Sequence, residues 1–145
     1  MVYGMSTFAF LFDEKPRLVT DRLVGRRIQP CDGARLHADL YADPAVTRSL
    51  DRRRWSRRQT LQFVESSTRH WRRHGFGLWV FEPRRAATYS TPSTSIVGVA
   101  GLETHRSQVR FVAHLQSKHW GRGLATEIGR EALAFGHYYL DLQTI

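Results

Sequence analysis

The sequence predicts a single α+β domain, a mixed α/β sandwich built on a mostly antiparallel sheet. Its 145 residues are one domain's worth of chain. With 41% hydrophobic residues, among them 4 Trp, 5 Tyr and 8 Phe, the chain can bury a core. Segments with alternating apolar residues are interspersed with segments where apolar residues recur every three or four positions, which indicates strands and helices. Residues 1–16 show no clear period, so we treat them as a leader of unknown role before a domain over 17–145.

The first half of the chain predicts extended structure followed by two helices. Residues 17–28 mix β-branched and apolar residues with polar ones, which indicates a strand or two short extended pieces. Apolar positions at helical intervals predict a first helix over 31–42, ended by the following Asp-Pro pair. A second helix begins at Ser56, which forms a capping box with the Gln three residues later, and ends at Gly75, which can adopt the left-handed conformation.

The second half predicts a hairpin, a further strand and a long helix. Segments 77–81 and 96–102 are rich in β-formers and flank the Pro/Ser/Thr-rich stretch 83–95, so we expect a hairpin with an exposed loop. Alternation over 109–115 predicts another strand, and helical spacing over 121–139 predicts a helix. We expect the sheet to follow the order of the chain, with the first two helices on one side and the last helix on the other.

Charge and cysteine content restrict the partners and the compartment. The 22 basic and 13 acidic residues leave a net charge of +9, which favours phosphates, nucleic acid or an acidic surface. The single cysteine, Cys31, can form neither an internal disulfide nor a multi-thiolate zinc site, so we expect a cytoplasmic protein without a metal. No apolar run approaches the roughly 20 residues of a membrane span, so no membrane insertion is predicted.

Histidines and aromatic residues in the middle of the chain have both a structural and a functional interpretation. His70 and His74 are four residues apart, but they lack the Glu or third ligand of a zinc site, so we interpret both as solvated helix positions. Trp71, Phe76 and Trp79 could line an acceptor cleft, yet aromatic residues at these spacings more often belong to a core. The core is the favoured interpretation.

The segment most informative for chemistry is Leu115–Glu127, where a strand passes through a glycine-containing turn into a helix. Gly121 and Gly123 let the backbone approach a ligand closely. The unpaired N–H groups of a helix start, with the positive end of the helix dipole behind them, favour an anion. A pyrophosphate would be held there, although two glycines before a helix also occur in turns that serve only packing.

Lys118-x-x-Gly121-x-Gly123-Leu124-Ala125 resembles the acetyl-CoA signature of the GNAT superfamily of N-acetyltransferases, where Gln or Arg is usual at the first position. The string from Trp120 to Glu127 is similar to the branch that acetylates ribosomal-protein N-termini. Further motifs of that branch follow in order along the chain: Thr20-Asp21-Arg22-Leu23-Val24 with Arg26, Asp43-Pro44-Ala45-Val46, and His74-Gly75-Phe76-Gly77-Leu78-Trp79.

The resemblance implies the acyl-CoA N-acyltransferase (GNAT) fold and direct transfer of an acetyl group from acetyl-CoA to a primary amine. The acceptor would be a protein N-terminus or a small molecule, and a base would first have to remove a proton from the amine. The main-chain N–H of Leu115 would stabilise the tetrahedral oxyanion. The residues implied in cofactor binding are Leu115, Lys118, His119, Gly121, Arg122, Gly123, Leu124, Ala125 and Thr126.

The chain departs from the branch in two respects that bear on catalysis. The branch often carries a glutamate base where Arg110 stands here, and Glu103 is a less favoured replacement. Residues 142–145 look like the beginning of another strand, and the last strands and helix of the family would follow it. We therefore expect an incomplete domain that is marginally stable, nearly inactive and prone to form homodimers through an open sheet edge.

Three functional classes remain open. The ordered motifs favour an acetyl-CoA-dependent N-acetyltransferase. Arg110 and the end of the chain favour an inactive relative that binds CoA or a partner. A basic module that binds RNA or the ribosome is supported only by the net charge and by the arginines at 52–54 and 57–58, so nucleic acid is the least favoured partner.

Overall fold

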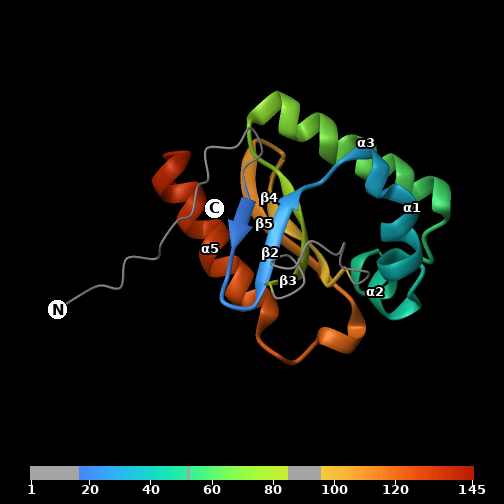
Figure 1. Cartoon of the computed structure of the whole chain (residues 1–145). Coiled ribbons are helices and arrows are strands. Elements are labelled where there is room, and N and C mark those ends of the chain that lie inside the picture. The colour runs from blue at the N-terminus through green and yellow to red at the C-terminus, as the bar shows by residue number, and fades with distance from the viewer. Residues whose placement is uncertain (1–16, 52, 85–95) are drawn as a thin grey trace.

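In the computed structural model, a five-stranded sheet separates helices packed on its two faces (Figure 1). The structure describes residues 17–51, 53–84 and 96–145. The expected leader over residues 1–16, and nearly all of the expected loop over residues 83–95, lie outside the described residues.

The sheet follows the order of the chain, and each neighbouring pair of strands is antiparallel, as predicted. The extended segment at 17–28 forms two strands, because the chain turns at Thr20–Arg22 and Thr20 Oγ1 accepts a hydrogen bond from the Leu23 amide (3.0 Å). The expected hairpin between the next two strands is confirmed by their antiparallel register. The strands are β1 (Arg17–Val19), β2 (Leu23–Arg27), β3 (Leu78–Pro83), β4 (Gly98–His105) and β5 (Gln108–Leu115).

The first helical segment is continuous from Pro30 to Tyr41 but changes its winding along the way. It runs through η1 (Pro30–Asp32), α1 (Gly33–Leu36) and η2 (His37–Tyr41), the last of which is a π-helical turn. The helix predicted over 31–42 is therefore confirmed.

Sequence analysis missed the helix α2 (Pro44–Leu50). Asp43 caps it, since its side chain accepts a hydrogen bond from the Ala45 amide (2.9 Å). Pro44 occupies the first helical position, where a proline costs nothing because that N–H has no intrahelical partner.

The long helix α3 (Arg57–His74) has the predicted ends. At its start, Ser56 Oγ accepts from the Gln59 amide (3.1 Å) and Gln59 Oε1 accepts from the Ser56 amide (2.7 Å). At its end Gly75 is left-handed, with φ 75°. The two reciprocal hydrogen bonds satisfy helix N–H groups that would otherwise have no partner.

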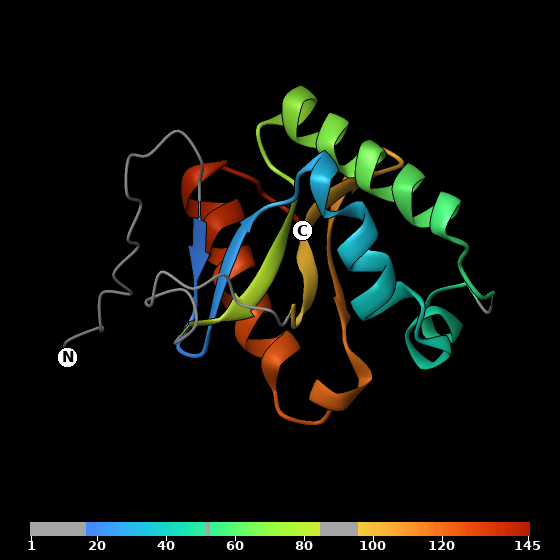
Figure 2. The ribbon, with the colours of Figure 1, turned by 45° about the vertical axis from the view of Figure 1, so that its right-hand side comes forward.

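Helix α5 (Leu124–Tyr139) covers the other face of the sheet, as predicted (Figure 2). It begins three residues later than the pattern indicated, since Gly121 and Gly123 are both left-handed (φ 75° and 73°) and cannot belong to a right-handed helix. A short turn, η3 (Ser117–His119), precedes them. Within the described residues, no helix combines the length and the apolar character needed to cross a membrane.

The expectation of a strand at 142–145 is wrong. Asp141 is left-handed (φ 53°) and turns the chain back, so the Leu142 amide donates to Gly136 O (3.1 Å). Leu142 and Ile145 then lie over Gly136, where an added Cβ would collide with Ile145.

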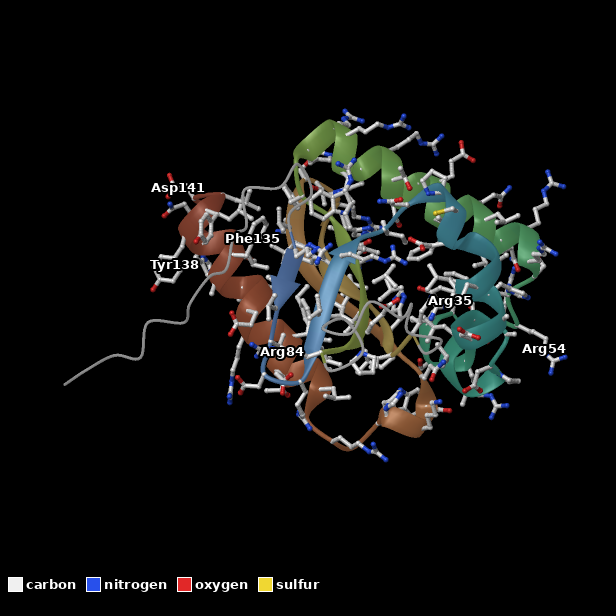
Figure 3. The ribbon with its side chains drawn as sticks, viewed as in Figure 1. Arg35, Arg54, Arg84, Phe135, Tyr138 and Asp141 are labelled. Atoms are coloured by element: carbon white, nitrogen blue, oxygen red, sulfur yellow. The ribbon has the colours of Figure 1, made fainter. Side chains whose placement is uncertain are left out.

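The core lies on both faces of the sheet and includes the three aromatic residues interpreted as core. Trp71 is 2%, Phe76 7% and Trp79 1% exposed. The indole of Trp71 donates to Leu78 O (2.8 Å), so its polar atom is satisfied. On α5, Phe135 points toward the sheet, whereas Tyr138 points away from it (Figure 3).

Candidate active site

The glycine turn, residues 120–123 between β5 and α5, leaves its backbone open at the two glycines. A Cβ added at Gly121 would meet nothing within 4 Å, and one at Gly123 would meet only Arg22 Nη2, at 3.9 Å. No side chain of the described residues caps α5, and its first intrahelical bond runs from the Glu127 amide to Gly123 O (3.0 Å). The amides without an intrahelical partner are those of Leu124, Ala125 and Thr126. This backbone suits a bound anion.

Two buried polar atoms in the approach to the glycine turn have no hydrogen-bond partner among the described residues. They are Gln116 Oε1 and His119 Nε2. Buried polar atoms in folded proteins nearly always have a hydrogen-bond partner, so we expect a ligand group or a water molecule to bind these two atoms. Burial, together with the charges of Lys118 and Arg122, lowers the pKa of His119, which favours the neutral imidazole.

The residues before the glycine turn are attached to the first helical layer. Gln116 Nε2 donates to Asp39 O (2.7 Å), and Ser117 Oγ donates to Asp43 Oδ2 (2.6 Å). The hydrogen bonds from Ser117 and the Ala45 amide lower the pKa of Asp43. The Asp43-Pro44 motif therefore supports the turn from the side, although it lies about 70 residues away in sequence.

The turn between β1 and β2 supports the glycine turn from another side. Glu127, in the first turn of α5, accepts hydrogen bonds from Thr20 Oγ1 (2.5 Å), the Arg22 amide (3.2 Å) and Arg22 Nε (2.8 Å). Arg22 Nη2 also donates to Arg122 O (3.0 Å). Sequence analysis singled out Thr20 and Arg22 only as part of a family motif and did not predict this contact.

The amide of Leu115 points toward the outer edge of the sheet. The Gln116 amide donates to Val97 O (2.9 Å), so the adjacent pair Gly98–Leu115 is a non-hydrogen-bonded pair of the antiparallel ladder. Both backbone groups of Leu115 therefore point away from β4. In agreement, Leu115 O accepts from the indole of Trp120 (2.9 Å). Among the described residues, no strand pairs with β5 on that side.

Arg110 and Glu103, the two residues considered in connection with a base, bind each other. They are opposite in register, and Glu103 Oε1 accepts from Arg110 Nη2 (2.7 Å) and Nε (2.9 Å). Leu115 is five residues further along β5, which corresponds to roughly 17 Å at the strand rise of about 3.4 Å per residue. Glu103 is therefore too far away to take a proton directly from an amine at the Leu115 amide.

A titratable side chain that sequence analysis did not consider lies next to Leu115. His114 faces the first helical layer, and its Nδ1 is 2.8 Å from the hydroxyl of Tyr41. The rings of Tyr41 and Phe63 flank the imidazole. Burial lowers the pKa of His114 to about 4, so the imidazole is neutral at pH 7. The alternation over residues 109–115 predicts the face of the sheet on which His114 lies, but it does not predict the contact with Tyr41.

A pocket of about 570 Å³ lies at the other end of the sheet, between the last turns of α3 and Thr104 on β4. Its basic side chains stand at a helix C-terminus, where cations offset the helix dipole. His70 is not the solvated residue we expected: its Nδ1 is 2.8 Å from Phe76 O, and its Nε2 accepts from the Thr104 amide (2.9 Å). His74 is exposed, as expected.

The fold and the glycine turn together define a class of protein, with one antiparallel sheet, helices on both faces and two left-handed glycines where the edge strand passes into a helix. A family model described as Acetyltransferase (GNAT) domain matches residues 22–145. The chain belongs to this family of acetyltransferases.

The chain is also similar in sequence or in structure to individual known proteins. The uncharacterized protein YkkB of Bacillus subtilis (strain 168) is 28% identical over 123 residues, which cover 84% of this chain and 69% of that protein. An acetyltransferase of Agrobacterium tumefaciens str. C58 has a TM-score of 0.70 at 20% identity, covering 91% of this chain and 72% of the other. RimL, the ribosomal L7/L12 alpha-N-protein acetyltransferase, has a TM-score of 0.66 at 14% identity, covering 88% and 68%. At these identities the structures show a shared fold.

Proposed function

We propose that this protein transfers the acetyl group of acetyl-CoA to a primary amine. The observation that carries the proposal is the uncapped start of α5, whose free amides follow two left-handed glycines. Several main-chain donors to a phosphate contribute about 1.5–3 kcal/mol each, which is enough to dominate the affinity for a nucleotide. His119 Nε2, which has no hydrogen-bond partner in the described part of the chain, provides one further polar atom beside the same turn.

The residues around the turn fit the parts of acetyl-CoA. The pyrophosphate would lie on the backbone of the turn, with the exposed side chains of Lys118 and Arg122 contributing positive charge. The Leu115 amide, which points to the outer edge of β5, would donate to the thioester carbonyl. The bound thioester supplies an activated acetyl group. The residues assigned to binding are Leu115, Lys118, His119, Gly121, Arg122, Gly123, Leu124, Ala125 and Thr126.

The acceptor is a primary amine of a protein N-terminus or of a small molecule. The similarity of the fold to RimL, an alpha-N-protein acetyltransferase, supports the first choice. We assign no catalytic base, because Glu103 is paired with Arg110 and lies far along the strand. The transfer would take place in the cytoplasm, in keeping with the single, exposed Cys31.

Calorimetry with acetyl-CoA tests the site. Valine at Gly123 would need a left-handed backbone and would place a branched side chain where the ligand approaches. We expect wild type to bind acetyl-CoA and Gly123→Val to lose at least tenfold in affinity, with Gly75→Val, a left-handed glycine outside the site, as the matched control. Equal affinity of wild type and Gly123→Val would contradict the proposed site.

A thiol-release assay with acetyl-CoA then tests the reaction, with N-terminal peptides and small amines offered separately. Acetyl transfer to either acceptor supports the enzyme. The ion pair between Glu103 and Arg110 favours a second candidate, a relative that binds CoA without catalysis. Binding of acetyl-CoA without any transfer would establish that second candidate.

The outer edge of β5 is also the surface through which a second copy could pair, because its outward N–H and C=O groups resemble the edge of any open sheet. Pairing there would use the same Leu115 N–H as the ligand. We therefore expect acetyl-CoA to shift any dimer toward the monomer in size-exclusion chromatography. A dimer that acetyl-CoA leaves unchanged would contradict pairing through this edge.

A further inference from the structure

Arg22 lies outside the glycine turn but bridges two of its parts. Its Nε donates to the Glu127 carboxylate (2.8 Å), and its Nη2 donates to Arg122 O (3.0 Å). Thr20 Oγ1 donates to the other oxygen of the same carboxylate (2.5 Å). We propose that Arg22 and Thr20, acting through Glu127, are positioning residues that hold the glycine turn in the shape that binds the pyrophosphate of acetyl-CoA. This inference rests on the proposed function.

Arg22 holds one peptide unit in the backbone of the glycine turn. The peptide unit between Arg122 and Gly123 is trans, so its N–H points opposite to its C=O. Because Arg22 holds Arg122 O, the Gly123 N–H is directed to the side away from Arg22, where a phosphate can reach it. The glycines on either side of Arg122 would otherwise let this peptide unit rotate. Fixing its direction before binding reduces the entropy lost on binding.

Glu127 places a carboxylate in the first turn of α5, next to the proposed phosphate site. A carboxylate in the first turn of a helix competes with a bound anion for the positive end of the helix dipole. Partial burial alone would raise the pKa of Glu127, but the hydrogen bonds from Thr20 and Arg22 outweigh it and lower the pKa. The carboxylate is therefore ionised and is held against the turn between β1 and β2, where Arg22 balances its charge.

The backbone of the β1–β2 turn is also held by hydrogen bonds from Arg84. The Arg84 amide donates to Arg22 O (2.8 Å), and Arg84 Nη1 donates to Thr20 O (3.3 Å). These hydrogen bonds involve only the backbone of Thr20 and Arg22. Substituting the two side chains therefore leaves the backbone of the turn held to the end of β3.

The test compares two donors. Acetyl-CoA carries the pyrophosphate, whereas S-acetylpantetheine lacks it. For Arg22→Ala we expect the Kd of acetyl-CoA to rise about tenfold, with no change in the Kd of S-acetylpantetheine. Arg130→Ala is the control for loss of one positive charge. It removes an exposed arginine of α5, about one helical turn after Glu127. Equal losses in the two arginine variants, or equal losses with the two donors, would overturn the inference.

For Glu127→Met, simple electrostatics and the positioning role predict opposite changes in the affinity for acetyl-CoA. The substitution removes a negative charge near the phosphates, so electrostatics alone would tighten the binding of acetyl-CoA. Loss of the carboxylate also releases Arg22, so we expect binding to weaken several-fold instead. In a double variant, adding Arg22→Ala to Glu127→Met should change the Kd of acetyl-CoA little, because each substitution removes the ion pair between Arg22 and Glu127. Tighter binding by Glu127→Met would overturn the inference.

The outcomes separate this inference from the proposed function. Wild type that does not bind acetyl-CoA overturns both. Wild type that binds, with Arg22→Ala and Glu127→Met binding equally well, overturns only the positioning role. Thermal melting reports whether each variant folds. If Arg22→Ala does not fold, Thr20→Val carries the test. It removes the hydroxyl that binds Glu127 and that also accepts from the Leu23 amide, so its melting is compared with wild type first. A folded Thr20→Val should bind acetyl-CoA more weakly, and unchanged binding would overturn the inference.

Discussion

Acidification should destabilise this protein through His114. The imidazole is buried against Tyr41, and burial lowers its pKa in the folded chain to about 4. In the unfolded chain the group returns to its ordinary value of about 6.5. Between these two values the unfolded state binds a proton that the folded state does not, so the free energy of unfolding falls as the pH falls.

The size of the effect follows from the two pKa values. A tenfold difference in proton affinity corresponds to about 1.4 kcal/mol, so the complete loss, reached below pH 4, is roughly 3 kcal/mol. At pH 5 the loss is about 2 kcal/mol, and above pH 7 it is close to zero. For a domain whose net stability is about 5–15 kcal/mol, this is a substantial fraction.

Urea unfolding at pH 7.5, 6.5 and 5.0 measures the effect in wild type and in His114→Gln. The amide of Gln can still bind the Tyr41 hydroxyl but does not titrate. We expect the stability of wild type to fall by about 2 kcal/mol more than that of the variant between pH 7.5 and 5.0. The other two histidines whose pKa is lowered, His70 and His119, titrate in both proteins and cancel in the comparison. Parallel pH profiles would refute the reasoning.

Three further substitutions test other features. Ser56→Ala removes the cap of α3 and should cost about 1 kcal/mol in urea unfolding; a change below about 0.3 kcal/mol would mean that the capping box adds little. Glu103→Gln should change the rate of acetyl transfer less than threefold, and a loss of a hundredfold or more would identify Glu103 as the base after all. Gly98→Ala would place a Cβ 2.3 Å from His114 O, so it should lower the melting temperature and impair acetyl transfer together, and unchanged melting would contradict the close approach of β4 and β5.

Features with a short-range signal could be predicted from the sequence. The reciprocal cap at Ser56 and the left-handed Gly75 depend on residues three or four positions away, and both ends of α3 were predicted correctly. Asp43-Pro44 was recognised as the end of one helix. The same two residues also begin α2, because a capping aspartate followed by proline is a start signal as well as a stop signal.

Features that depend on distant parts of the chain could not be predicted. His70 was interpreted as solvated because its own helix offers no partner, yet its Nε2 is satisfied by the Thr104 amide of a strand 34 residues away. Residues 142–145 were expected to pair as a strand. Nothing in the local sequence showed that Leu142 and Ile145 would instead cover Gly136 of the preceding helix.

Three of the four family motifs meet at one place in the fold, and this explains why they belong together. The Thr20-x-Arg22 motif reaches the glycine turn through Glu127, and the Asp43-Pro44 motif reaches it through Ser117. The fourth motif, His74–Trp79, connects α3 to β3 and contributes the buried Phe76 and Trp79. The first two motifs therefore contact from outside a turn whose own side chains supply the hydrogen bond from the Trp120 indole to Leu115 O. A turn that contains two glycines can approach a ligand closely, and contacts from outside the turn restrict the conformations that glycine allows.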